Sequence, residues 1–247
     1  MASQTKVREM IAKNNAKKGG LSDKIVPIIL AIISAISILT TIAILFTLLT
    51  ETITFFTRVP LSKFFLSGTW NPTGSSPEFG IWALIIGTLK ITVIATIVAV
   101  PIGLGAAIYL NEYASDRSRR IIKPILEILA GIPTIVFGFF ALTFVTPILR
   151  NLIPNLGEFN SISPGIVVGI MIVPMITSMS EDAMSSVPDK IREGAFGLGA
   201  TKFEVATKVV LPAATSGVVA SIVLGISRAI GETMIVSLAA GLSLIHI

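Results

Sequence analysis

The sequence predicts an all-α fold, a polytopic bundle of membrane helices in which five spans are visible. Hydrophobic residues make up 53% of the 247 and charged residues only 13%, with a mean hydropathy of +0.87. That balance is far from the one typical of a soluble domain. Several apolar runs reach the roughly 20 residues that cross a hydrocarbon core about 30 Å thick. Lysine and arginine gather in alternate connections, as cytoplasmic loops do.

The same composition excludes several classes of function. Beside five or six spans, the chain has no room for a catalytic soluble domain. The net charge of +5 reflects loop asymmetry, because no basic stripe with interleaved aromatics suggests a nucleic-acid partner. The sequence contains no cysteine, so disulfides, iron–sulfur clusters and thiolate metal sites are excluded. We expect this chain itself to bind no metal and no cofactor.

The first span is expected from Ile25 to about Leu49, after a basic N-terminus of residues 1–24. The apolar run is too long for a signal peptide and no small-residue cleavage site follows it, so the helix should be retained. Residues 51–80 should form a loop, since they are rich in turn formers around Trp70-Asn-Pro72 and Gly74-Ser-Ser-Pro77. The N-terminus is placed in the cytoplasm by six cations: Lys6, Arg8, Lys13, Lys17, Lys18 and Lys24.

The second span is expected over about 81–110 and the third over about 126–149. Pro101 lies in the inner half of the second, where membranes tolerate a kink if a neighbouring helix packs closely. Gly103 and Gly105 lie beside it. Gly131-Ile-Pro133 interrupts the third span. Between the two spans the chain should return to the cytoplasm through a basic cluster of Arg117, Arg119, Arg120 and Lys123.

The fourth span is expected over about 165–184 and the fifth over about 214–241. Gly165 and Gly169 have a spacing that permits close helix approach, although glycine is also frequent in membrane helices in general. The loop 185–213 between these spans should lie in the cytoplasm. Its cations are Lys190, Arg192, Lys202 and Lys208. Residues 25–241 would thus form one membrane domain.

The last six residues, 242–247, are Leu-Ser-Leu-Ile-His-Ile. They match the translation of a transposon-end adaptor used in DNA library preparation, and a genuine short tail is the alternative. We expect this tail to be non-native and assign no function to His246. An odd number of spans also leads us to expect that the native protein continues past Gly241 with a sixth helix.

The most informative motif lies in the loop between the fourth and fifth spans. Glu193-Gly-Ala-Phe-Gly-Leu-Gly199 is followed after nine residues by Val209-Val-Leu211-Pro212. We predict one short helix over 193–198 and another over 201–210. Gly199 can take a positive φ at little cost and so redirect the chain between them, while Pro212 fixes the entry into the next span. The product would be a rigid projecting turn able to enter a groove on a partner.

This spacing resembles the EAA loop of ABC-importer permeases, E-A-A-x3-G-x9-I-x-L-P, with glycine and valine replacing one alanine and the isoleucine. The resemblance implies docking of a cytoplasmic ABC ATPase, which would carry ATP and Mg. Glu193 would orient the loop by a hydrogen bond or an ion pair rather than perform chemistry. An ordinary helical hairpin between spans is the alternative. The docking residues implied are Glu193, Gly194, Ala195, Gly199, Leu211 and Pro212.

Further stretches resemble a particular family, the permeases of phosphate-specific ABC importers, over about residues 20–241. The resemblance is to the first of the two permeases and implies a type I importer fold with six helices per subunit. It also implies a second permease, two copies of the ATPase, an external phosphate-binding protein and the lipid membrane of a prokaryotic cell. The stretches are Trp70-Asn-Pro72, Phe79-Gly-Ile81, Gly87-Thr-Leu89, Val100-Pro-Ile-Gly103, Ala130-Gly-Ile-Pro-Thr-Ile-Val-Phe-Gly138, Ile176-Thr-Ser178, Ser180-Glu-Asp182 and Ser227-Arg-Ala-Ile-Gly-Glu-Thr233.

Two charges lie inside the expected fifth span. Arg228 and Glu232 are four residues apart, which would place them on one helical face. An ionised side chain there costs about 2.5 kcal/mol or more, so such residues usually face a bundle interior. Either the two form an ion pair that fixes packing, or Arg228 meets phosphate on the translocation route while Glu232 holds it. Lys90, near the outer end of the second span, could line the same route or extend to the interface.

Two rival functions remain open on the sequence alone. A permease for another oxyanion, such as sulfate or molybdate, would share the loop motif. A proton-coupled secondary transporter would use Arg228 and Glu232 as a relay, and an inverted internal repeat, which is not apparent, would support it. The phosphate-binding motif G-x-x-x-x-G-K-[ST] is absent from the sequence, so ATP hydrolysis is expected on a partner and not on this chain.

Overall fold

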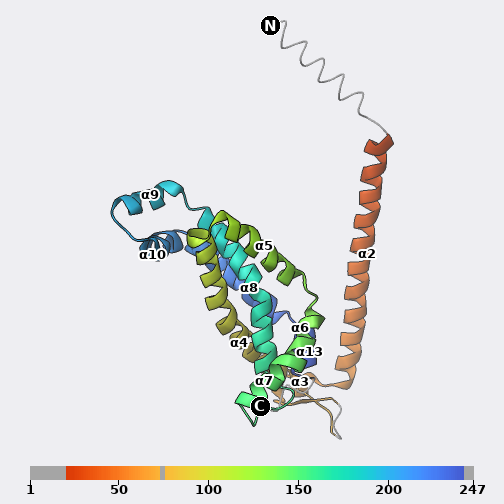
Figure 1. Cartoon of the computed structure of the whole chain (residues 1–247). Coiled ribbons are helices and arrows are strands. Elements are labelled where there is room, and N and C mark those ends of the chain that lie inside the picture. The colour runs from red at the N-terminus through yellow and green to blue at the C-terminus, as the bar shows by residue number, and fades with distance from the viewer. Residues whose placement is uncertain (1–20, 73–75, 242–247) are drawn as a thin grey trace. The chain divides into compact units, whose positions relative to one another are not determined.

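The computed structural model of the chain describes residues 21–72 and 76–241 (Figure 1). Most of the basic N-terminal segment and the six-residue tail lie outside this part, so the expectations about them stay predictions. The chain divides into two compact units, one up to Leu61 and one from Ser62 onward. Each unit is described by itself.

In its described residues, the first unit consists mainly of one long helix, α2 (Leu21–Arg58). Its apolar stretch Ile25–Arg58 is long enough to cross a membrane, as predicted, but the helix continues nine residues past the expected end at Leu49. Threonines explain the continuation. Thr52 and Thr54 donate their hydroxyl hydrogens to backbone carbonyls four residues earlier, at 2.7 and 2.9 Å. These polar side chains are therefore satisfied inside the helix and do not end it.

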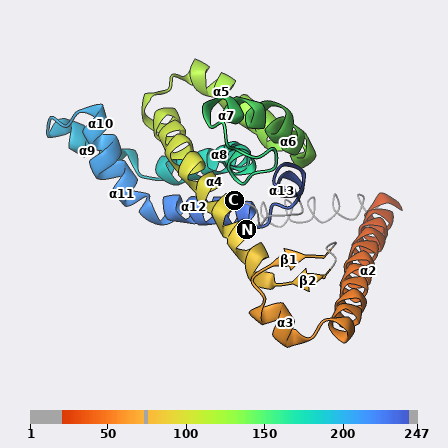
Figure 2. The same cartoon turned by 90° about the horizontal axis from the view of Figure 1, so that it is seen from below.

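A short helix and a hairpin precede the spans of the second unit. They are α3 (Leu61–Leu66), β1 (Trp70–Asn71) and β2 (Glu78–Phe79), and the two strands pair antiparallel. The Trp70 and Phe79 rings meet edge to face at 5.7 Å. Figure 2 shows the hairpin beside the start of α4. No span-length helix lies in the described residues between α2 and α4, as the turn formers predicted.

Two of the predicted spans are single long helices. They are α4 (Ile81–Ile108), which continues into the π-helical turn η1 (Tyr109–Tyr113), and α8 (Ile162–Ser185). Both agree closely with the boundaries expected from the sequence.

The third span is interrupted as predicted. The helix α5 (Asp116–Gly131) ends at the expected break, and Ile132 and Pro133 are extended. The chain then continues through α6 (Thr134–Phe140), η2 (Ala141–Val145) and α7 (Thr146–Leu152). Only 134–152 is long and apolar enough to span by itself, because α5 is amphipathic and charged in its first half. The start expected at residue 126 was therefore too early.

The predicted uninterrupted fifth helix is wrong. The chain forms α11 (Leu211–Ala213), α12 (Thr215–Ile230) and, after a break, α13 (Met234–Ala239). Gly231, a poor helix former, lies at the break. Among the described residues four helices can span a membrane, and a fifth span is counted only if Lys202–Ala213 and α12, bent by 77°, are taken together. At 16 residues α12 is about 24 Å long, shorter than the bilayer core.

The second unit is organised around α8, which packs against α4, α5, α6, α12 and α13. Glycines bring the backbones together. A Cβ on Gly165 would lie 2.7 Å from Ile94, and one on Gly169 would lie 2.9 Å from the Ala95 carbonyl oxygen. The close approach predicted from the glycine spacing is thus confirmed. On the other flank of α8, Ile176 fills the space left by glycines of α4 and α12.

Small hydroxyls join the same helices. Thr177 on α8 donates to the Gly103 carbonyl of α4 at 3.2 Å. The hydroxyl of Ser180, also on α8, lies 2.6 Å from the hydroxyl of Ser221 on α12. All three side chains are buried. In an apolar interior such hydrogen bonds satisfy the polar groups and add specificity to packing driven by small residues.

The packing predicts opposite effects for one substitution at two glycines. Gly169→Ala should destabilise the chain by about 1–3 kcal/mol, because the added methyl meets backbone. Gly105→Ala, on α4 with open space around it, should be neutral or stabilise by up to about 1 kcal/mol. Thermal unfolding of the purified protein in detergent measures both. Equal shifts for the two variants would contradict the packing.

Candidate functional site

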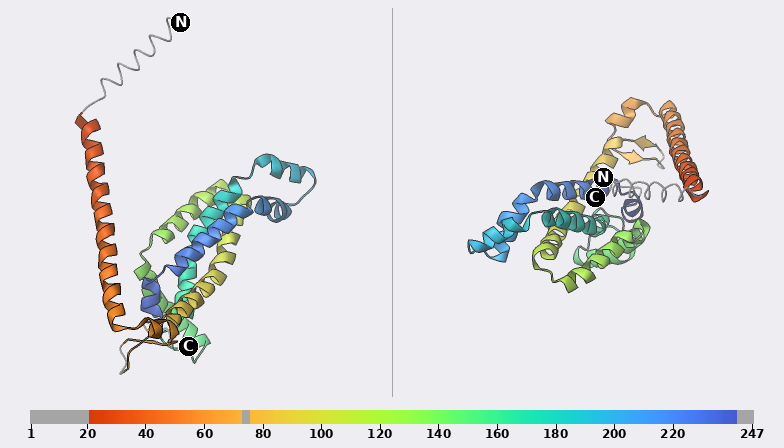
Figure 3. Two further views of the ribbon diagram at one scale, coloured as in Figure 1. Left: turned by 180° about the vertical axis from the view of Figure 1, so that it is seen from behind. Right: turned by 90° about the horizontal axis from the view of Figure 1, so that it is seen from above.

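A helical loop projects from the end of the second unit where α4 and α8 end (Figures 1 and 3). It consists of α9 (Asp189–Gly197), α10 (Lys202–Glu204) and the π-helical η3 (Val205–Val210). The two predicted short helices are therefore present, although the first begins at residue 189 and not at 193. We refer to residues 189–213 as the projecting loop.

Gly199 makes the turn between the two helices, as predicted. Its φ is +86°, a conformation that costs other residues 1–2 kcal/mol. Its N–H donates to Phe196 at 2.9 Å, and the N–H of Ala200 donates to Ala195 at 3.1 Å. These two bonds form a Schellman motif, which satisfies the last carbonyls of α9 and fixes the direction of the exit.

A capping box starts the second helix. The Thr201 hydroxyl accepts from the Glu204 N–H at 3.3 Å, and the Glu204 carboxylate accepts from the Thr201 N–H at 3.1 Å. The Thr201 backbone hydrogen bond and then Lys208, 3.0 Å away, lower the pKa of Glu204 from 4.5 to about 2. Because the pKa of Glu204 is lowered in the folded chain, the ionised carboxylate stabilises the fold fully above pH 4.5, and this stabilisation is lost as pH falls toward 2.

Apolar side chains cover the tip of the projecting loop. Leu198 is 91% exposed and Phe203 66% exposed, as expected of side chains that await a partner surface. A hollow of about 420 Å³ lies between the two helices. It is lined by Ala195, Leu198, Gly199, Ala200, Glu204, Lys208 and Val209.

All six expected docking residues lie in this loop, but their surroundings differ. Glu193 and Gly194 are exposed on α9, whereas Ala195 is half-buried against the second helix. Leu211 and Pro212 form the start of α11, below the bend into α12. Among the described residues the Glu193 side chain has no hydrogen bond or ion pair, and its role in orienting the loop stays a prediction.

The contact that does orient the projecting loop was missed in the sequence. Arg192 on α9 donates to the Met184 carbonyl at 2.7 Å and to Asn111 Oδ1 at 3.1 Å. Its Nε lies 3.3 Å from Glu112, and its Nη1 lies 2.9 Å from Asp189. The Arg192 and Glu112 side chains are only 16% and 8% exposed. The sequence showed Arg192 only as one of several loop cations.

A second ion pair extends this network. Glu181, a buried residue of α8, lies 2.7 Å from Lys123 of α5. Asn111 donates to the Glu181 carbonyl at 3.5 Å, and Arg119 donates to the carbonyls of Leu110 and Asn111 at 2.7 and 2.6 Å. In the sequence, Glu181 stood out only as part of Ser180-Glu-Asp182, and no residue spacing predicted that it would pair with Lys123.

The predicted ion pair between Arg228 and Glu232 is not formed. Arg228 is exposed near the end of α12, and no carboxylate of the described residues lies within 4 Å of its guanidinium. The helix ends at Ile230, so a spacing of four no longer places the two charges on one face. The Glu232 Oε1 accepts instead from the N–H groups of Met234 and Ile235, at 3.1 and 3.3 Å. Glu232 thus caps the helix after the break.

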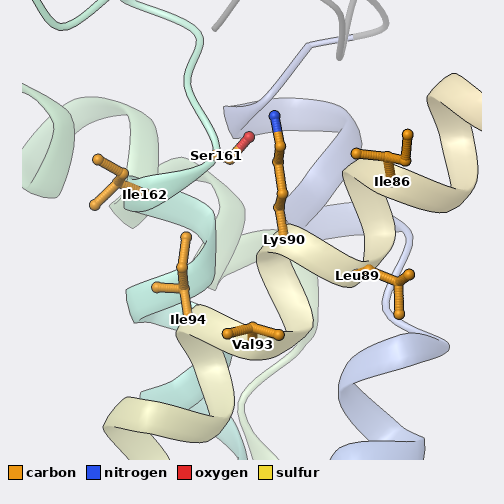
Figure 4. A pocket seen from close by; sticks show the side chains of 7 residues that line it. All are labelled: Ile86, Leu89, Lys90, Val93, Ile94, Ser161 and Ile162. Atoms are coloured by element: carbon orange, nitrogen blue, oxygen red, sulfur yellow. The ribbon is translucent and has the colours of Figure 1, made fainter.

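Lys90 lies elsewhere, in an apolar groove of about 490 Å³ between α4 and the start of α8. Figure 4 shows its side chain extended at the mouth of the groove near Ser161. No hydrogen bond or ion pair joins Lys90 to Arg228 or Glu232 in the described part of the chain. The role of these three residues in a common pathway therefore stays a prediction.

The fold is thus a bundle of membrane-length helices with a helical loop projecting from one end. Comparison with known families identifies the class of protein. The chain belongs to the family described as binding-protein-dependent transport system inner membrane component, whose model matches residues 99–246.

Two individual relatives are similar to this chain in sequence. The chain is 38% identical over 180 residues to a probable ABC transporter permease protein, YqgH, of Bacillus subtilis, covering 72% of this chain and 58% of the relative. It is 37% identical over 198 residues to the phosphate transport system permease protein PstC of Haemophilus influenzae, covering 72% and 62%. The chain thus spans about three fifths of the length of these relatives.

A solved structure supports the fold alone. A chain of the MetNI methionine ABC transporter in an inward-facing conformation superposes with a TM-score of 0.52 at 22% identity. The match covers 61% of this chain and 71% of that one.

The turn of the projecting loop can be tested by itself. Gly199→Val forces a β-branched residue to a φ of +86° and should cost about 1–2 kcal/mol locally. Amides of residues 200–205 should then exchange hydrogen roughly tenfold faster. Gly197→Val is the control, since Gly197 also has open space around it but no positive φ. Equal exchange rates in the two variants would argue against a strained turn.

Proposed function

We propose that this chain is a permease subunit of an ATP-driven importer that moves inorganic phosphate into the cell. The similarity to PstC supports phosphate as the substrate. The observation that carries the proposal is Arg228, an exposed guanidinium without a carboxylate partner among the described residues. It lies near the end of α12, which would enter the membrane as part of the bent fifth span.

The position of Arg228 is costly unless water, a ligand or another subunit covers it. A cation among hydrocarbon chains costs about 2.5–3.5 kcal/mol or more. A water-filled route between this subunit and a second permease removes that cost. A guanidinium suits phosphate because its planar donors can bond two oxygens of the anion at once.

Glu232 supports this role in a different way from the one expected. Its carboxylate is held by two backbone N–H groups of α13, so it does not neutralise Arg228. The cap stabilises the break after Ile230 and leaves the guanidinium available to an anion. Lys90, at the opposite end of the bundle from the projecting loop, would attract phosphate toward the entrance of the same route.

The projecting loop supports a proposal for the other subunits of the transporter. Its exposed Leu198 and Phe203 and its rigid turn fit docking to a cytoplasmic ABC ATPase. Two copies of that ATPase would hold the ATP and Mg, so this chain would not itself be an enzyme. A second permease and an external phosphate-binding protein complete the complex. The N-terminus and the loop would face the cytoplasm of a prokaryotic cell.

The pathway role of Arg228 predicts a strict requirement for its shape. Arg228→Lys keeps the charge but loses the two-pronged donor geometry, and should lower phosphate uptake at least tenfold in assembled transporters. Glu232→Gln retains an oxygen that can cap α13 and should lower uptake less. Uptake of radiolabelled phosphate into vesicles with matched complex levels measures both effects.

Competing anions identify the substrate, and the energy source identifies the class of transporter. Excess unlabelled phosphate should abolish the uptake, whereas sulfate and molybdate should not. Near-normal uptake by Arg228→Lys would contradict the pathway role. Uptake that a proton gradient drives without ATP would overturn the importer assignment in favour of a secondary transporter.

Docking of the ATPase makes a separate prediction. Gly199→Val should reduce ATP-driven uptake several-fold while the helices still insert, because the turn that presents Leu198 is strained. Gly197→Val again serves as the control. Unchanged ATPase co-purification together with unchanged uptake in Gly199→Val would count against docking at this loop.

A further inference from the structure

We propose that Arg192 is a rigid joint through which the projecting loop moves the ends of α4 and α8. The inference rests on the proposed function, because it requires a partner that displaces the loop. Arg192 would be a positioning residue that touches neither substrate nor nucleotide.

The guanidinium contacts two neighbouring elements, α8 and η1, and its own helix. One terminal nitrogen reaches both the Met184 carbonyl in α8 and the Asn111 amide oxygen in η1, at 2.7 and 3.1 Å. The Nε lies 3.3 Å from Glu112 Oε1 of η1, an ion pair that does not have hydrogen-bond geometry. The other terminal nitrogen contacts Asp189 in its own helix at 2.9 Å. A planar group with five donors can hold acceptors in such fixed directions, whereas an ammonium cannot.

Burial makes this joint resist separation. The side chains of Arg192 and Glu112 are 16% and 8% exposed, so their attraction is only weakly screened by water. If α9 turned away from η1, it would leave a buried carboxylate without its cation. A displacement of the projecting loop therefore has to carry η1 and the end of α8 with it.

The contacts continue beyond the joint. Asn111 also donates to the Glu181 carbonyl, and Glu181 pairs with Lys123 of α5. Arg119 holds the carbonyls of Leu110 and Asn111 and so fixes η1 from the other side. The ends of α4, α5 and α8 are thereby joined to the loop in one contiguous set of polar contacts, which is a physical route for coupling.

The first test separates coupling from assembly. In the assembled transporter, Arg192→Lys should leave ATP hydrolysis within about twofold while phosphate moved per ATP falls at least fivefold. Arg117→Lys is the matched control, because Arg117 is exposed on α5 with no hydrogen bond or ion pair among the described residues. An unchanged ratio of phosphate to ATP in Arg192→Lys would overturn the joint.

The second test measures rigidity directly. Because the sequence has no cysteine, a double variant with Lys190→Cys on α9 and Tyr113→Cys on η1 carries one spin label at each of these two positions. With Arg192 present, the label distance should be the same without nucleotide and with bound ATP. In Arg192→Lys the distribution should broaden and shift between the two states. A distance that changes equally in both proteins would also overturn the joint.

If Arg192→Lys does not assemble into a transporter, a variant that removes only one contact of Arg192 tests the joint. Glu112→Gln keeps the other three contacts of Arg192 and should broaden the label distance with a smaller loss of coupling. An unbroadened distance in that variant overturns the joint. If the parent protein shows no ATP-driven phosphate uptake but its label distance still depends on Arg192, the joint stands and the proposed function fails.

Discussion

The close contact of α8 with α4 and α12 is the constraint on which the rest of the second unit depends. Glycines at 103, 165, 169 and 225 let the helices approach until side chains of one meet the glycine surfaces of the next. Between helices in a bilayer there is no hydrophobic driving force, so this packing and the buried hydroxyl pairs supply the association. With the three helices fixed, the position of the projecting loop at one end and of Arg228 on α12 is fixed as well.

The charged groups at the loop end of the bundle differ in their surroundings from Arg228. At the loop end, Arg192, Glu112 and Glu181 are paired and largely buried, and Lys123 pairs with Glu181 from a more exposed position, which suits a rigid mechanical connection. Arg228 is exposed and unpaired among the described residues, which suits a site that an anion enters and leaves. Under the proposed function, the same guanidinium chemistry would serve a permanent contact at Arg192 and a transient contact at Arg228.

The sequence predicted most of the spans and the projecting loop because their signals are local. Apolar length determines a membrane helix, and the glycine between two short helices determines a turn, so Gly199 could be assigned its positive φ in advance. The Arg228–Glu232 pair failed for a physical reason: it assumed a continuous helix, whereas Gly231 and the Glu232 cap begin a new one. The Arg192 network could not be predicted, since its partners are up to 81 residues away in the chain.

The central claim is that Arg228 is left unpaired by this fold in order to meet phosphate. A cryo-electron microscopy structure of the assembled transporter, trapped with phosphate and a hydrolysis-deficient ATPase, tests it most directly. The account predicts phosphate oxygens within hydrogen-bond distance of the Arg228 guanidinium, with Glu232 still capping α13. An Arg228 paired with a carboxylate of the second permease, and phosphate bound elsewhere, would contradict it.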